Sequence, residues 1–305
     1  MTSPPLMLNL SSKRSCPEWE ETLITIGTDP IIARIGSLAI SWHGVLMALG
    51  IIVAVLLTFY LAKRGGISTE AVFTIAFWSV LFAILGARLV HVLDKLDYYS
   101  HHLGEIPAFW EGGLAWYGGL IFGILAMIIS ARLLKVPLGR FADAGAPSVM
   151  LGLAIGRIGC TINGDVAGGP TSLPWGIIYS NPDSYPAQWG LLGVKTQPAP
   201  VYEIMWCMAV FGVLWWLRGR LKPEGSLFLL MLAIYSVGRF IISWSRFEEV
   251  EEPVLGPLHQ AHVISIIMLV VAVALLAYKK VGWAKPEPPE GVTTEDKSSK
   301  DMEVI

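Results

Sequence analysis

The sequence predicts an all-α polytopic membrane protein with about seven transmembrane helices, its N-terminus outside and its C-terminus in the cytoplasm. Of its 305 residues, 54% are hydrophobic and 15% are charged, with a mean hydropathy of +0.58. Ordinary soluble domains carry about 25% charged residues. The second observation is a series of apolar runs, each close to the roughly 20 residues that a helix needs to cross a bilayer. The net charge of -2 gives no reason to expect a nucleic-acid partner.

The chain divides into three regions. Residues 1–38 carry mixed charges and lack the apolar centre of a secretory signal, so we expect a retained N-terminal segment outside the cytoplasm. Residues 39–280 form the transmembrane domain, and residues 281–305 have the composition of a disordered cytoplasmic tail. Within the domain, apolar runs begin near Ala39, Ala71, Leu114, Phe141, Pro200, Gly225 and Pro257. Pro147 and several glycines interrupt the fourth run, but helices inside a bundle tolerate both.

The orientation follows from the basic residues in the short loops. They follow the first, third, fifth and last runs: Lys63, Arg64, Arg132, Lys135, Arg140, Arg218, Arg220, Lys222, Lys279 and Lys280. Because cytoplasmic loops carry an excess of Lys and Arg, these ends should be cytoplasmic. An odd number of spans then places the N-terminus outside.

Unusual polar residues gather toward the opposite, outer ends of the runs. Arg157 lies near the end of the fourth run, and an arginine at membrane depth costs roughly 2.5–3.5 kcal/mol on insertion scales. Arg239 and Arg246 are seven residues apart, so they share a helix face and need an anion between them. That anion could be internal, Asp165 or Glu203, or it could be a phosphate ligand, which suits the planar guanidinium fork. Other candidates at this depth are His43, Tyr117, Asn163, Gly168 and His262.

Each candidate also has a structural explanation. His43 and His262 could be buried histidines with ordinary hydrogen bonds, and Tyr117 could be an interfacial aromatic residue. Arg157 could extend its side chain to the membrane interface. Cys160 is expected to be a small packing residue. The three cysteines are too few for a disulfide framework, and no Cys/His spacing suggests zinc, so we expect no structural metal and no cofactor.

The segment from Gly156 to Gly168 closely resembles the signature of the prolipoprotein diacylglyceryl transferases, a family of bacterial inner-membrane enzymes. The family also has seven spans and an outside N-terminus. Other segments match the family in order over roughly residues 29–280. The matching segments are Ser41-Trp42-His43-Gly44, Gly86-Ala87-Arg88-Leu89, Glu111-Gly112-Gly113-Leu114, Tyr117-Gly118-Gly119, Gln197-Pro198, Val201-Tyr202-Glu203 and Gly238-Arg239 with Arg246.

Some positions differ from the family pattern. Cys160 stands where the family commonly has Asn, and Asp165 where it has Glu. The family's Tyr in the first span and His in the third are here His43 and Tyr117. If these two side chains face one chamber, the exchange keeps one imidazole and one phenol in the site. Two further differences are Ser243 for an acidic residue and His262 for Gln.

The resemblance implies transfer of the diacylglyceryl group of phosphatidylglycerol to the lipobox cysteine thiol of a prolipoprotein signal peptide, with release of glycerol phosphate. Its partners would be membrane lipid and these precursors, and it would be located in the bacterial inner membrane. Arg157 and Arg239 would stabilise the phosphate leaving group, and His43 or Tyr117 would act as the base that activates the thiol. Gly168, Arg246 and His262 would contribute to substrate binding, whereas Asn163, Asp165 and Glu203 would orient the arginines and the headgroup. One alternative is a catalytically silent relative that binds anionic lipid. A transporter is less favoured, because the inner halves of the spans are apolar.

Overall fold

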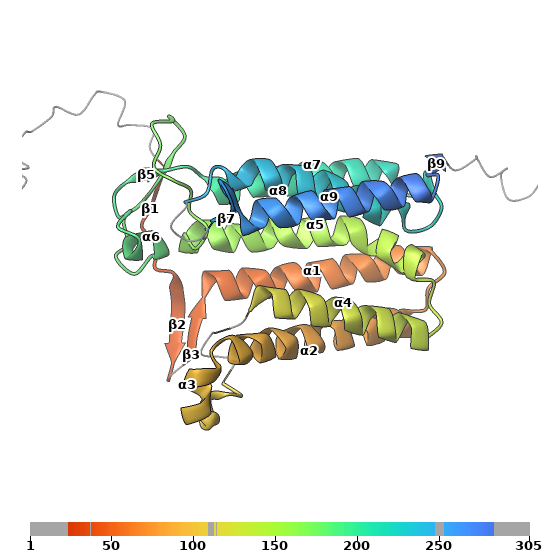
Figure 1. The fold of residues 1–305 in the computed structure, drawn as a ribbon, viewed down its shortest axis with the longest axis horizontal. Coiled ribbons are helices and arrows are strands. Elements are labelled where there is room, and N and C mark those ends of the chain that lie inside the picture. Colours follow the sequence, from red (N-terminus) through yellow and green to blue (C-terminus); the bar gives the residue numbers. More distant parts are fainter. Residues whose placement is uncertain (1–23, 37, 109–112, 114, 248–252, 284–305) are drawn as a thin grey trace, which may run out of the picture.

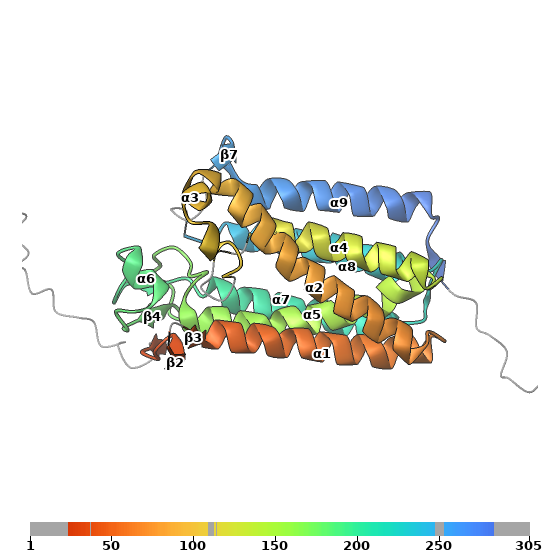
Figure 2. The same ribbon diagram turned by 90° about the horizontal axis from the view of Figure 1, so that it is seen from below.

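The computed structural model describes residues 24–36, 38–108, 113, 115–247 and 253–283. Residues 284–305 of the predicted tail, which was expected to begin at 281, and most of the N-terminal segment lie outside these residues. Long helices run roughly parallel through the molecule, and short strands gather at the ends of the bundle (Figures 1 and 2). The long helices are α1 (Trp42–Arg64), α2 (Thr69–Asp94), α4 (Trp116–Leu133), α5 (Leu138–Asn163), α7 (Ala199–Leu217), α8 (Ser226–Ser243) and α9 (Gln260–Tyr278).

Six of these helices are long and apolar enough to cross a membrane. The exception is α4, whose described apolar stretch, Tyr117–Leu133, is shorter, so its status as a seventh span stays a prediction. The interruption expected in the fourth run does not break α5, which continues through the buried Pro147. Many large apolar side chains on these helices are exposed, as expected for surfaces that face lipid.

Short elements connect the helices. Three strands, β1, β2 and β3, precede α1 in the chain. The strand β1 pairs in parallel with β4, and β4 pairs with β5, while β2 pairs with β3, β6 with β9 and β7 with β8. The short elements are β1 (Ile24–Ile26), β2 (Ile31–Ile35), β3 (Leu38–Ser41), α3 (Leu96–His101), the 3-10 helix η2 (Leu103–Glu105), β4 (Ile177–Tyr179), α6 (Tyr185–Gln188), β5 (Lys195–Thr196), β6 (Leu221–Lys222), β7 (Pro253–Leu255), β8 (Leu258–His259) and β9 (Gly282–Trp283).

Glycines set the distance between α1 and α5. A Cβ atom added to Gly152 would lie 2.7 Å from the carbonyl oxygen of Gly50, and one added to Gly159 would lie 2.8 Å from the Cα of His43. Small residues let two backbones approach closely, which is how helices associate in membranes. Gly156 continues this face, because its Cβ would contact the Met47 sulfur. The glycine face therefore holds the start of α1 against the end of α5.

Two charged side chains at helix ends have structural roles. Arg88 donates hydrogen bonds to the carbonyl oxygens of Glu105, Ile106 and Gly113, at 2.6, 2.8 and 3.0 Å, and so fixes the loop between α2 and α4. Asp143 accepts hydrogen bonds from backbone N–H groups at the start of α8. Both side chains satisfy backbone groups that secondary structure leaves without partners.

Candidate functional site

Three arginines meet one buried glutamate near the start of α7. The Glu203 side chain is only 4% exposed, and its carboxylate forms ion pairs with Arg157, Arg239 and Arg246. The distances from its Oε1 are 2.5 Å to Arg239 Nη1 and 2.6 Å to Arg246 Nη2, while Arg157 pairs with Oε2. We call these four residues the arginine cluster. One carboxylate neutralises one of three guanidinium charges, so the cluster keeps two positive charges.

The fold brings the cluster together from three helices and from the segment after α8. Arg246 lies in that segment, so it does not share a helix face with Arg239 as their spacing suggested, because α8 ends at Ser243. Arg157 lies near the end of α5, Glu203 near the start of α7 and Arg239 near the end of α8, so all lie at the same end of the antiparallel bundle. The internal anion that the sequence left open is therefore Glu203, which takes all three arginines. Because the arginine donors outnumber the carboxylate acceptors, an additional anion can still bind here.

Gly168 allows the loop after α5 to approach Arg246. The two residues form an isolated β-bridge, and the Gly168 N–H donates to the Gln197 carbonyl oxygen at 3.0 Å. A Cβ atom on Gly168 would collide with the carbonyl oxygens of Gln197 and Ser245. Glycine is thus required for this close approach, and the contact described is made by its backbone.

A second group of side chains lies around His43. Its Nδ1 is 3.1 Å from Asp165 Oδ2 and 3.4 Å from Cys160 Sγ. One ligand atom from each of the three residues lies within 4.8 Å of the others, so the set could hold a metal ion. Imidazole, thiolate and carboxylate are also the usual ligands of zinc. The expectation of no structural metal remains untested.

Cys160 connects the two groups. Arg157 Nη1 lies 3.6 Å from Cys160 Sγ, on the same face of α5. This cysteine was expected to be a small packing residue, and the structure places it between His43 and Arg157. Its spacing of three residues from Arg157 was the available signal, because such residues are neighbours on a helix. The candidate site therefore runs continuously from the start of α1 to the end of α8.

The loop between α5 and α7 is tied to the end of α5. Gly164 ends the helix in a left-handed conformation with φ of 77°, and Asn163 before it is buried. The Tyr179 hydroxyl donates to the Thr161 carbonyl oxygen at 2.9 Å, and burial raises the pKa of this phenol above its ordinary value. Tyr179 therefore stays neutral as a donor, and its hydrogen bond holds β4 against the site.

Two predicted residues lie elsewhere on the bundle. Tyr117 is at the start of α4, which packs mainly against α2, whereas His43 is at the start of α1, which packs mainly against α5. A shared chamber for the two thus stays a prediction. His262 is fully buried in the first turn of α9, where its Nδ1 accepts the His259 N–H and its ring contacts Trp244. These contacts are structural, and a role for His262 in substrate binding stays a prediction.

Comparisons with known proteins agree with the motif. Residues 30–278 match the profile of the family described as prolipoprotein diacylglyceryl transferase. A phosphatidylglycerol–prolipoprotein diacylglyceryl transferase of Geobacillus kaustophilus is 36% identical over 84% of this chain and 95% of its own length. Proteins of the same name from a Nostoc species and Listeria innocua are 37% and 32% identical, over 82% and 86% of this chain and 88% and 92% of theirs.

The match spans every long helix of the bundle and both groups of side chains described above, and relatives above 30% identity align over nearly their whole length. The chain belongs to the prolipoprotein diacylglyceryl transferase family.

Proposed function

We propose that this protein transfers the diacylglyceryl group of phosphatidylglycerol to the lipobox cysteine thiol in the signal peptide of a prolipoprotein. The substrate sulfur forms a bond to the glyceryl carbon that carries the phosphate. The bond from that carbon to the phosphate oxygen breaks, and glycerol phosphate leaves with the electron pair. The enzyme acts as a multi-pass protein of the bacterial inner membrane, with the candidate site on its outer side.

The observation that carries this proposal is the arginine cluster. Its two uncompensated positive charges match the negative charge that develops on a phosphate leaving group. The side chains of Arg157 and Arg239 are 20% and 19% exposed, so a bound phosphate would meet them with little competing water. Charge-assisted hydrogen bonds are stronger in such surroundings.

His43 is the candidate base for the substrate thiol. Asp165 lies against its Nδ1, an arrangement that orients an imidazole. The other ring nitrogen can then take the proton from the thiol, because the thiolate is the reactive nucleophile. Cys160 also contacts the imidazole, and in this proposal it positions His43. The reacting thiol is that of the substrate cysteine.

Reconstitution of the purified protein tests the proposal. Vesicles of phosphatidylglycerol receive the enzyme and a synthetic lipobox peptide, and mass spectrometry follows the peptide. We expect the peptide to gain one diacylglyceryl group and glycerol phosphate to appear in equal amount. Phosphatidylcholine vesicles serve as the matched control and should give no product. Binding of phosphatidylglycerol without any gain in peptide mass would instead favour the silent relative.

A further inference from the structure

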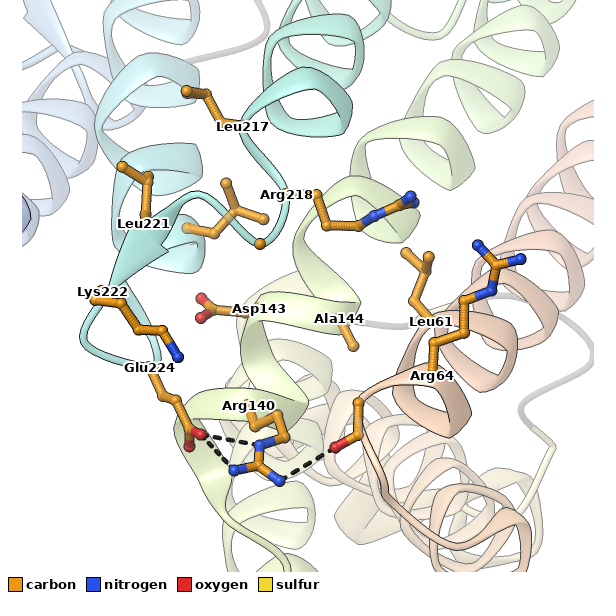
Figure 3. Close-up of a pocket in the computed structure, with 13 residues that line it drawn as sticks. Leu61, Arg64, Arg140, Asp143, Ala144, Leu217, Arg218, Leu221, Lys222 and Glu224 are labelled. Carbon is orange, nitrogen blue, oxygen red and sulfur yellow. Dashed lines mark hydrogen bonds and ion pairs between the residues drawn. The ribbon is translucent and has the colours of Figure 1, made fainter. Parts of the chain in front are cut away.

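A cavity of about 590 Å³ opens at the end of the bundle opposite the arginine cluster (Figure 3). It lies between the end of α1, the start of α5, the end of α7 and the start of α8. Leucines from these elements form the apolar part of its lining. The charged side chains of the lining are Arg64, Arg140, Asp143, Arg218, Lys222 and Glu224, four cations and two carboxylates.

Both carboxylates are already engaged by the protein. Glu224 accepts two hydrogen bonds from Arg140, at 2.6 and 2.9 Å. Asp143 accepts the backbone N–H groups of Gly225 and Phe228, at 2.7 and 2.9 Å, which fixes the start of α8. Arg140 compensates the charge of Glu224, and the N-terminus of α8 compensates that of Asp143. Both carboxylates lie on one side of the cavity (Figure 3).

Arg64 and Arg218 point toward the other side of the cavity (Figure 3). Within the described part of the chain, neither has a carboxylate within ion-pair distance. Arg64 stacks on Tyr60 and Arg218 on Trp215, with guanidinium-to-ring distances of 4.4 and 4.1 Å. The Nη1 atom of Arg218 is buried and has no hydrogen-bond acceptor among the described residues. A buried donor without an acceptor is costly and indicates a missing partner.

We propose that this cavity binds a phosphate-bearing anion between Arg64 and Arg218. Two guanidinium forks in one cavity suit phosphate oxygens, and Arg218 Nη1 gains the acceptor it lacks. The leucines beside them suit the apolar acyl chains of a phospholipid. The anion is either the headgroup of an anionic lipid or a soluble phosphate. Basic pockets between transmembrane helices are known to hold lipid headgroups on the cytoplasmic side, where charge bias places this end.

The test compares the full-length protein with Arg64→Gln/Arg218→Gln. Arg132→Gln is the matched control, because Arg132 is an exposed arginine at the same end of the bundle that does not line the cavity. Native mass spectrometry counts the dioleoyl phosphatidylglycerol molecules that each protein retains. Thermal stability in detergent, measured against inorganic phosphate, gives the affinity for the soluble anion. Arg64→Gln alone changes only an exposed side chain, so it provides a folded variant if the double change fails to fold.

Loss of one retained lipid, or a lipid affinity about tenfold weaker, identifies a lipid site. An equal loss of phosphate affinity with the lipid count unchanged identifies a soluble phosphate instead. Each result supports the phosphate site provided that Arg132→Gln behaves as the unchanged protein. The proposal is overturned if Arg64→Gln and the double variant keep both the lipid count and the phosphate affinity. The comparison leaves the arginine cluster intact, so its outcome is independent of transfer activity.

Discussion

At the residue scale, Glu203 determines how much positive charge the site can offer. It organises three arginines whose mutual repulsion would otherwise separate them, and it neutralises only one of them. Removing one partner from a buried ionic group costs about 3–5 kcal/mol, since the remaining charges lose their compensation. Glu203 thus supports the fold at this end of the bundle and also leaves the charge that a phosphate needs.

Arg157→Lys tests whether the shape of the guanidinium group matters as well as its charge. Lysine keeps the positive charge but cannot reach Glu203, Cys160 and a phosphate oxygen together. Loss of one charge-assisted hydrogen bond, about 1.5–3 kcal/mol, should lower kcat/KM by about 10- to 160-fold in the reconstituted assay. Arg132→Lys, at the other end of the bundle, should keep full activity. Full activity in Arg157→Lys would remove this arginine from the mechanism.

His43→Ala tests the base through the pH dependence of transfer. Without the imidazole, the substrate thiol must ionise unaided, and a free thiol has a pKa of about 8.5. The thiolate fraction then rises from about 3% at pH 7 to about 50% at pH 8.5. Activity of the variant should therefore fall at pH 7 and recover several-fold toward pH 8.5, as measured by peptide mass gain. A variant equally poor at both values would assign His43 to structure.

The exchange of His43 and Tyr117 relative to the family pattern gives a second test. If both side chains serve one chamber, His43→Tyr and Tyr117→His should each reduce activity, and the double change should restore much of it. Residues in contact show interaction energies of about 0.5–3 kcal/mol in such cycles. Transfer rates of the four proteins provide the measurement. A double variant no better than the worse single one would make the exchange coincidental.

The sequence identified most of the residues that the structure brings together, but it did not predict which of them contact one another. Arg157, Arg239, Arg246 and Glu203 were all candidates because charges at membrane depth are costly and need partners. Which carboxylate pairs with which arginine depends on how helices far apart in the chain pack, and no local pattern records it. Cys160 shows the same limit, because it lies 117 positions along the chain from His43, which it contacts.

At the element scale, hydropathy located the long helices to within a few residues, but the connecting structure was not predicted. The run expected from Ala71 became α2, which begins at Thr69, and the run from Pro200 became α7, which begins at Ala199. The strands β4 and β5 have only 3 and 2 residues, too few for a periodic pattern, and β4 takes its second partner from β1 near the N-terminus.

The glycine face between α1 and α5 gives a prediction at this scale. Gly152→Ala places a Cβ 2.7 Å from the Gly50 carbonyl oxygen and should destabilise the bundle by roughly 1–3 kcal/mol. Gly145→Ala is the control on the same helix, because its Cβ would meet nothing within 4 Å. Alanine there should be neutral or stabilising, since it favours helix. Thermal unfolding in detergent measures both, and equal midpoints would show that α1 and α5 adjust without cost.

At the scale of the whole molecule, the two ends of the bundle have different chemistry. The candidate site joins the start of α1 to the ends of α5 and α8, on the side of the strands β2 and β3 (Figure 1). The other end carries Arg64, Arg140 and Arg218 around the second cavity. If the excess of basic residues sets the orientation, the site faces outward and the second cavity faces the cytoplasm. A membrane lipid and an exported precursor then both reach the site from the outer side of the membrane.

Single cysteines at the two ends test this orientation. Gln188, in α6 beside the site, and Glu70, at the start of α2 near the other end, are both exposed. In a Cys16→Ser background the remaining native cysteines, Cys160 and Cys207, are buried and should react slowly. A maleimide that cannot cross membranes should label Gln188→Cys in intact spheroplasts, but label Glu70→Cys only after lysis. The reverse pattern would place the arginine cluster in the cytoplasm, where an exported precursor could not reach it, and both the orientation and the proposed transfer would fail together.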